Sequence, residues 1–148
     1  MSGRADEDLF SGDEAATRRA GAALARRLAR GDVVLLFGEL GTGKTVFVRG
    51  LAEGLGTDPN EVSSPTFALV HEYGPAGREP VLVHADFYRL PDEELAARGA
   101  DLGLEEHGNA VLAIEWPRPP WTAARAWRVT ITEAQGGRRI SIEPPREG

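Results

Sequence analysis

The feature that most constrains the fold of this chain is a glycine-rich segment, GELGTGKT, at residues 38–45. It matches the pattern G-x-x-x-x-G-K-[ST] and directly follows the continuous apolar run Val33–Phe37, which is typical of a strand covered on both faces. Phe47 and Leu51 recur at helical spacing, so a helix is expected to begin at the glycine-rich turn and to end near Gly56. The segment therefore predicts a buried strand, a phosphate-binding loop and a helix in succession.

The residue types of this loop suit the binding of phosphate groups. Glycines allow consecutive backbone N–H groups to point at one anion, and the helix that follows adds the positive end of its dipole. Lys44 reaches the β- and γ-phosphates, and Thr45 offers a hydroxyl to a magnesium ion, which takes few protein ligands. The sequence thus predicts nucleoside triphosphate binding by the whole loop: Gly38, Glu39, Leu40, Gly41, Thr42, Gly43, Lys44 and Thr45.

The basic residues of the chain are almost all arginine. Of 17 lysine and arginine residues, Lys44 alone is lysine. This usage indicates a general compositional bias towards arginine rather than a separate function for each arginine. At the loop, a planar guanidinium is too large and stiff to replace the lysine.

Composition excludes several classes of protein. The formal net charge of −6 argues against a free-standing nucleic-acid binder, which normally carries a basic patch. The absence of cysteine excludes disulfides, thiolate metal sites and a cysteine nucleophile. No apolar run approaches the roughly 20 residues that span a bilayer. We therefore expect a cytoplasmic protein without membrane attachment, folded as one domain over residues 1–148 with flexible tails at 1–10 and 144–148.

The other elements follow from apolar patterning. Ser11 and Glu14 have the spacing of a capping box, which predicts a helix that extends to about Arg30. Residues 91–108 are expected to form one or two short helices. Further strands are predicted at 67–70, 81–85 and 111–114, and the alternating stretches around 127–132 and 140–142 predict a hairpin. Together these elements predict an α/β fold of the three-layer P-loop NTPase type, with a mixed sheet and a C-terminal antiparallel hairpin.

Two acidic residues stand at the ends of buried strands and are candidates to handle magnesium. Asp86 follows the run that ends at Ala85, and Glu115 follows the run that ends at Ile114. The ends of neighbouring parallel strands meet at one edge of a sheet, where the phosphate loop also lies. The alternative for each is a strand-end residue that meets solvent or an arginine. Thr66, in the segment SSPT, is a candidate to sense the γ-phosphate, or it belongs to a simple turn.

Other polar and aromatic residues have both a structural and a functional interpretation. His71 and His84 are either packed strand residues or acid–base groups. The arginines of the first helix form either a solvated face or a surface for a partner. The tryptophans are more typical of packing than of base stacking. These groups are Arg19, Arg26 and Arg30, and Trp116, Trp121 and Trp127.

Beyond the phosphate loop, an ordered set of motifs extends along nearly the whole chain. These are VSSPTFALVHEY, VLVHADFYRL, DEELAARGADLGLEEH and VLAIEWP, in that order after GELGTGKT. The set resembles the bacterial TsaE (YjeE) family, the small P-loop ATPases of tRNA threonylcarbamoyladenosine biosynthesis. One departure is visible, because Trp116-Pro117 runs into Arg118 where the family often has an acidic residue.

The resemblance implies an activity and partners. It implies slow, magnesium-dependent ATP hydrolysis that acts with the TsaD and TsaB proteins, which modify adenosine 37 of tRNA, so that tRNA is met only through the complex. It implies catalytic roles for Lys44, Asp86 and Thr66, and magnesium binding by Thr45 and Glu115. Glu14 or Thr17 is expected near the adenine. The alternatives are a small P-loop metabolite or nucleotide kinase and a nucleotide-sensing module without catalysis.

Overall fold

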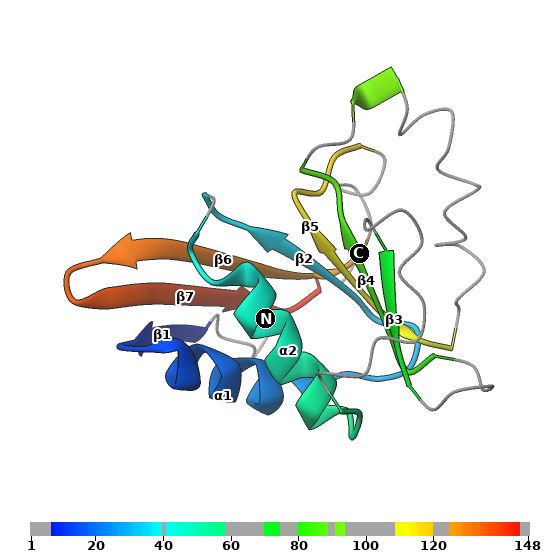
Figure 1. The fold of residues 1–148 in the computed structure, drawn as a ribbon, viewed down its shortest axis with the longest axis horizontal. Coiled ribbons are helices and arrows are strands. Elements are labelled where there is room, and N and C mark those ends of the chain that lie inside the picture. Colours follow the sequence, from blue (N-terminus) through cyan, green and yellow to red (C-terminus); the bar gives the residue numbers. More distant parts are fainter. Residues whose placement is uncertain are drawn as a thin grey trace.

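The computed structural model describes residues 7–39, 41–58, 70–74, 80–88, 91–93, 109–119 and 125–145. Within these ranges the chain forms one seven-stranded sheet in the order β1-β7-β6-β2-β5-β4-β3, with the helices beside it (Figure 1). The elements are β1 (Glu7–Ser11), α1 (Glu14–Ala25), β2 (Val33–Phe37), α2 (Lys44–Gly54), β3 (Val70–Tyr73), β4 (Leu82–Asp86), β5 (Val111–Glu115), β6 (Trp127–Ala134) and β7 (Gly137–Glu143).

The sheet is mixed, as the sequence predicts. Strands β6, β2, β5 and β4 are parallel neighbours, whereas β7 and β1 on one side and β3 on the other pair antiparallel. Strands β6 and β7 form the predicted C-terminal hairpin, and Gln135 and Gly136 make its turn. Gly136 has φ 83°, a left-handed conformation that glycine adopts without strain.

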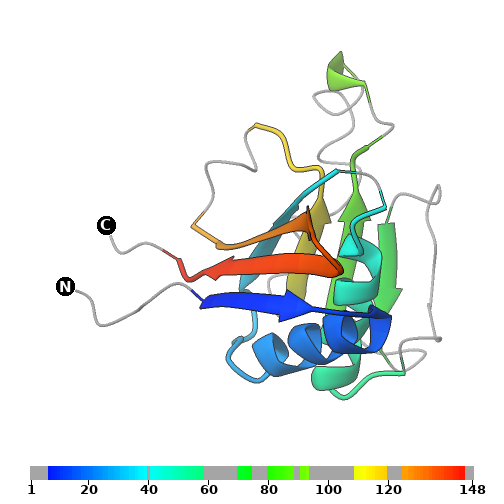
Figure 2. The ribbon, with the colours of Figure 1, turned by 90° about the vertical axis from the view of Figure 1, so that its left-hand side faces the viewer.

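Helices α1 and α2 pack together against one face of the sheet (Figure 2). Their backbones approach so closely at Gly21 and Gly50 that a side chain at either position would clash with the other helix. A Cβ on Gly50 would meet the carbonyl group of Arg18, and one on Gly21 would lie 3.0 Å from the backbone nitrogen of Leu51. This contact fixes α2, and with it the end of the loop that precedes α2, against α1.

Strand β2 is covered on both faces. Val34 and Leu36 belong to the apolar cluster under the helices, whereas Leu35 belongs to a second cluster on the opposite face, and all three are fully buried. The helices predicted over residues 91–108 lie almost entirely outside the described residues. Among the residues that the structure describes, no helix has the length and apolar character needed to cross a membrane.

The N-terminal part of the chain differs from the prediction. Glu7–Ser11 form strand β1, paired with β7, where a flexible tail is predicted up to residue 10. The N-cap of α1 is Asp13, whose carboxylate accepts a hydrogen bond of 2.8 Å from the N–H of Ala16. Ser11 ends β1 instead, because strand pairing outcompetes the capping box there.

Helix α1 also ends earlier than predicted, at Ala25 rather than near Arg30. The chain then turns, and the Asp32 carboxylate accepts a hydrogen bond of 2.8 Å from the N–H of Ala29 just before β2 begins. This local side-chain bond competes with continuation of the helix. Gly31, with φ 88°, lies in this turn and not at the helix end.

Candidate nucleotide site

The glycine-rich loop joins β2 to α2 at the edge of the sheet. Gly38, Gly41 and Gly43 have φ values of 146°, 78° and 102°, which only glycine adopts readily. Gly43 is the N-cap of α2, so the free N–H groups of the first helical turn open toward the site. The loop thus has the local geometry that the sequence predicts; Leu40 lies outside the described residues.

Lys44 is almost completely buried at the start of α2. Its Nζ donates hydrogen bonds to the carbonyl oxygens of Gly38 and of Glu39, the latter at 3.0 Å. The Nζ also lies 4.3 Å from the centre of the Trp116 ring, in a cation–π contact. Burial lowers the pKa of Lys44, while nearby Glu115 and other carboxylates raise it in opposition. Lys44 is therefore folded back on its own loop.

Asp86 and Glu115 end neighbouring parallel strands and face each other in register. The Glu115 side chain is buried, and its Oε2 accepts a hydrogen bond of 3.0 Å from Oγ1 of Thr45 on α2. This contact connects the end of β5 to the first turn of the helix after the loop. The structure thus brings three of the predicted site residues together. Within the described part of the chain, Glu115 is buried and its recorded partners do not include an arginine.

Asp86 is the more open of the two carboxylates. It is half-buried, and its Oδ1 accepts a hydrogen bond of 3.0 Å from the N–H of Tyr88 in the turn after β4. Burial lowers the pKa of Lys44, and the negative charge of Asp86 acts against this lowering. Asp86 therefore lies on the same edge as the loop, with one carboxylate oxygen held by the backbone.

His84 is a partner of Glu115 that sequence reasoning did not single out as such. Its Nε2 lies 2.6 Å from Oε2 of Glu115, and both side chains are buried. Burial by itself raises the pKa of Glu115, but the hydrogen bond and charge of His84, with Thr45 and Lys44, bring that pKa below its ordinary value. The spacing of the sequence indicates this position, because residues two apart on a strand share a face and His84 precedes Asp86 by two.

Trp116 adopts an unusual backbone conformation directly after β5. Its φ is 56°, a left-handed value that is uncommon for a residue with a large side chain. This bend places the indole beside Lys44 and in a tilted contact with the ring of Tyr88, with ring centres 4.8 Å apart. Strain of this kind costs about 1–3 kcal/mol and clusters at functional sites.

The oxygen atoms at this edge of the sheet suit a magnesium ion. The Thr45 hydroxyl and the Glu115 carboxylate lie 3.0 Å apart, and Asp86 is the register partner of Glu115. These are hard oxygen donors, which magnesium prefers, and it needs only one or two of them beside its waters. In the described part of the chain, no three His, Cys, Asp or Glu side chains are grouped as an ion-binding cluster. The fit therefore rests on the hydroxyl and one or two carboxylates.

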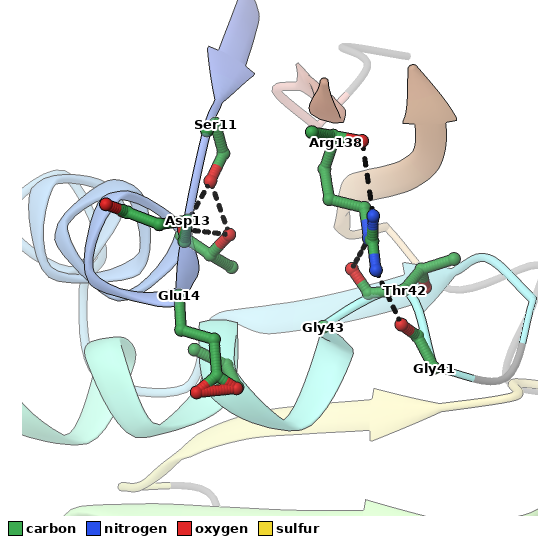
Figure 3. Close-up of a pocket in the computed structure, with 11 residues that line it drawn as sticks. Ser11, Asp13, Glu14, Gly41, Thr42, Gly43 and Arg138 are labelled. Carbon is green, nitrogen blue, oxygen red and sulfur yellow. Dashed lines mark hydrogen bonds between the residues drawn. The ribbon is translucent and has the colours of Figure 1, made fainter. Parts of the chain in front are cut away.

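A pocket of about 230 Å³ opens beside the loop, between β1, α1 and the hairpin. Figure 3 shows Ser11, Asp13 and Glu14 on one wall, with Thr42 and Arg138 on the other. The walls carry hydroxyls and carboxylates on one side and backbone carbonyls with a guanidinium on the other. Thr17 also lines the pocket, so both residues expected near an adenine reach it.

The structure describes some of the remaining predicted residues and not others. Thr66 and Trp121 lie outside the described residues. Trp127 is buried in the core under the helices, as expected of a packing residue, and the three arginines considered for a partner surface are exposed. Arg118, the position at which the sequence departs from the motifs that it resembles, donates a hydrogen bond of 3.1 Å to the carbonyl of Phe87. It thereby connects the segments after β4 and β5.

The chain is similar to known proteins in both its sequence and its fold. A family model described as "Threonylcarbamoyl adenosine biosynthesis protein TsaE" matches residues 11–140. The tRNA threonylcarbamoyladenosine biosynthesis protein TsaE of Nostoc sp. is 38% identical over 141 residues, covering 92% of this chain and 85% of the relative. That of Treponema pallidum is 40% identical over 131 residues, covering 85% and 92%. The crystal structure of Bacillus subtilis YdiB superimposes with a TM-score of 0.68 at 25% identity, covering 96% of this chain and 87% of that one.

Proposed function

Because the chain belongs to the TsaE family of threonylcarbamoyl adenosine biosynthesis proteins, we propose that it is the ATP-binding and ATP-hydrolysing subunit of the tRNA N6-threonylcarbamoyladenosine machinery. The observation that carries this proposal is the meeting of the phosphate loop with Glu115 through Thr45. Asp86 lies in register beside Glu115. Sites of this composition bind a nucleoside triphosphate and stabilise the charge that moves during phosphoryl transfer.

In the proposed reaction, water attacks the γ-phosphorus of ATP, the bond to the β,γ-bridging oxygen breaks, and ADP and phosphate leave. Lys44 releases the carbonyls of Gly38 and Glu39 and turns to the β- and γ-phosphates, whose charge compensates for its burial. The N–H groups of the loop bind the same oxygens. Because little covalent chemistry is required of the protein, positioning and charge stabilisation do most of the work.

The two carboxylates have separate roles in this scheme. Thr45 and Glu115 would hold a magnesium ion, which would supply positive charge against the charge that develops on the phosphates. Asp86, or a water beside it, orients the attacking water. His84 keeps the Glu115 carboxylate ionised and aimed at Thr45. Thr66 is proposed to sense the γ-phosphate.

We place the nucleoside in the pocket beside the loop. The carboxylate of Glu14 and the hydroxyl of Thr17 line it, and both can accept a hydrogen bond from the amino group of adenine. The pocket continues along Gly41, Thr42 and Gly43, so a bound nucleotide would run from it onto the phosphate loop. This arrangement favours ATP as the nucleotide.

The partners follow from the family and from the charge of the chain. We propose that the chain acts in the cytoplasm with the TsaD and TsaB proteins, which carry the transfer reaction themselves. The net charge of −6 is unfavourable for binding tRNA directly, so tRNA is met through those partners. Direct, tight tRNA binding by the purified chain would contradict this division of labour.

One experiment separates the proposal from its alternatives. ATP turnover and formation of the modified nucleoside are measured for the pure protein, alone and with TsaB, TsaD and tRNA. The proposal predicts slow ATP hydrolysis alone and faster hydrolysis in the complex. Transfer of phosphate to an added metabolite instead of water would favour a small kinase, and ATP binding without hydrolysis in either mixture would favour a nucleotide sensor.

A further inference from the structure

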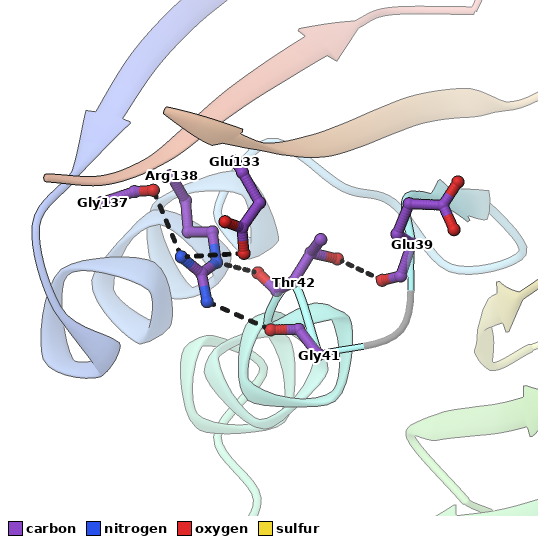
Figure 4. Close-up of polar contacts among 6 residues, drawn as sticks. All are labelled: Glu39, Gly41, Thr42, Glu133, Gly137 and Arg138. Carbon is purple, nitrogen blue, oxygen red and sulfur yellow. Dashed lines mark hydrogen bonds and ion pairs between the residues drawn. The ribbon is translucent and has the colours of Figure 1, made fainter. Parts of the chain in front are cut away.

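Arg138, at the start of β7, donates hydrogen bonds from the hairpin to the phosphate loop. Its Nε donates a hydrogen bond of 3.2 Å to the carbonyl of Thr42, and its Nη2 donates one of 3.1 Å to the carbonyl of Gly41 (Figure 4). Its Nη1 bonds to the carbonyl of Gly137 at 3.2 Å. All three guanidinium nitrogens therefore have acceptors, and two of these acceptors lie in the loop.

The ion pair of Arg138 with Glu133 does not account for this arrangement. The Nη1 lies 3.5 Å from Oε1 of Glu133, and the glutamate side chain is 75% exposed. Exposed pairs of this kind contribute little to stability. The short contacts of the guanidinium are with backbone carbonyls, and hydrogen bonds from a charged donor are the stronger ones.

Two cations share the carbonyl oxygens of the loop. Lys44 binds those of Gly38 and Glu39, and Arg138 binds those of Gly41 and Thr42. In a trans peptide the C=O and the next N–H point in opposite directions. Holding the Thr42 carbonyl against the hairpin therefore turns the N–H of Gly43 away from the hairpin.

The two cations differ in what nucleotide binding asks of them. Lys44 must break its hydrogen bonds to the loop carbonyls to reach the phosphates. Arg138 contacts the loop from the hairpin side, so its hydrogen bonds can persist when the phosphates bind. After Lys44 moves, Arg138 is the cation that remains on the loop carbonyls of the described structure. A bond to a cation also polarises the peptide and strengthens its N–H as a donor.

We propose that Arg138 is a positioning residue that keeps the phosphate loop in its anion-binding conformation, coupling the tip of the β6–β7 hairpin to nucleotide binding. The inference rests on the proposed function, since it requires that the loop binds a nucleotide. The hairpin already supports the loop elsewhere, because a Cβ on Gly38 would clash with the carbonyl of Ile131 on β6. Arg138 adds a polar support to this steric one.

The test compares three variants in titrations with ATP and with ADP. Arg138→Ala removes these hydrogen bonds, Arg138→Lys keeps the charge without the planar fork, and Arg139→Ala is the matched control on the same hairpin. Arg139 is exposed, and its Nη1 lies 3.8 Å from Oδ2 of Asp8. Dissociation constants, kcat, KM and the melting temperature without nucleotide are measured for each.

We expect Arg138→Ala to raise the dissociation constants of both nucleotides about tenfold, as for the loss of bonds from a charged donor. Arg138→Lys should fall between that variant and the wild type, and Arg139→Ala should match the wild type. Millimolar guanidinium ion should restore binding to Arg138→Ala and leave Arg139→Ala unchanged. This rescue separates positioning from a general loss of stability.

The outcomes that overturn the inference are distinct from those that overturn the proposed function. If Arg138→Ala binds both nucleotides as tightly as the wild type, with or without a lower melting temperature, the role of Arg138 is refuted. The proposed function still holds in that case, because the wild-type protein binds nucleotide. Equal weakening in Arg138→Ala and Arg139→Ala would refute it as well. A wild-type protein that binds neither ATP nor ADP would refute both.

Discussion

His84 and Glu115 meet in the protein interior, with Nε2 of the imidazole 2.6 Å from Oε2 of the carboxylate. The side chains are only 6% and 5% exposed, and they come from the neighbouring strands β4 and β5. A buried carboxylate is costly unless donors surround it. Here the imidazole and the Thr45 hydroxyl serve as these donors, so Glu115 can remain ionised beside the phosphate loop.

Replacing His84 by Phe should destabilise the fold by about 2 kcal/mol, because a buried carboxylate loses a partner. In the double variant with Glu115→Leu, the loss should be smaller than the sum of the two single losses, since neither polar group is then left unpaired. Urea unfolding of the four proteins gives the coupling free energy. Strictly additive losses would show that the two side chains do not interact.

Stability should fall in two separate pH windows. Burial, and then the neighbouring His84, lower the pKa of His71 from 6.5, so the folded state binds this proton less readily than the unfolded state. The contribution of His71 to the free energy of unfolding is therefore complete above pH 6.5, and it declines as the pH falls from 6.5 toward the lowered pKa. Glu115, whose pKa lies below 4.5, stabilises the fold above that pH and loses its contribution as the pH falls through the lower value.

Unfolding free energies measured between pH 8 and pH 3 test both windows. His71→Asn should flatten the decline just below pH 6.5 and leave the acid limb in place. Glu115→Gln should weaken the acid limb instead. A His71→Asn protein with the wild-type slope below pH 6.5 would assign that slope to other groups.

The close packing of α1 on α2 predicts a sensitive glycine. Gly50→Ala should destabilise the protein by about 2–3 kcal/mol, because the new methyl group clashes with the carbonyl group of Arg18 and the helices must separate. Gly12→Ala is the control, since the nearest atom to its Cβ would be Cε2 of Phe10 at 3.6 Å. Thermal unfolding compares the two, and equal melting temperatures would contradict the packing described.

The stacking of Lys44 on Trp116 predicts an optical signal of nucleotide binding. When Lys44 leaves the indole for the phosphates, the environment of that ring changes, and tryptophan emission should change with saturable dependence on ATP. The change should be absent in Trp116→Phe and present in Trp127→Phe, whose ring lies in the core under the helices. A signal of the same size in Trp116→Phe would arise from another tryptophan and would contradict this prediction.

The central architecture is predictable from sequence because its signals are local. The apolar run Val33–Phe37 and the glycines after it specify a strand, a loop and a helix without reference to the rest of the chain. The alternation in the last third specifies the hairpin equally well. Asp86 and Glu115 were also predictable, since the ends of parallel strands meet at one edge.

Features that depend on distant partners were not predictable in this way. β1 is short, and it forms because β7 offers an unpaired edge at the far end of the chain. Its formation moves the N-cap of α1 from Ser11 to Asp13. The hydrogen bond from Arg138 to Thr42 joins residues 96 positions apart. No local sequence pattern distinguishes Arg138 from the 16 other lysine and arginine residues.

ATP hydrolysis by the Lys44→Ala variant, measured with TsaB and TsaD present, is the most direct test of the phosphate loop as the catalytic site. Lys44 is the only lysine of the chain, so no neighbouring lysine can take its place on the phosphates. Turnover should fall at least about 100-fold, because the positive charge that stabilises the transferred phosphoryl group is removed. Lys44→Ala protein that hydrolyses ATP at the wild-type rate would contradict the assignment of this loop as the catalytic site.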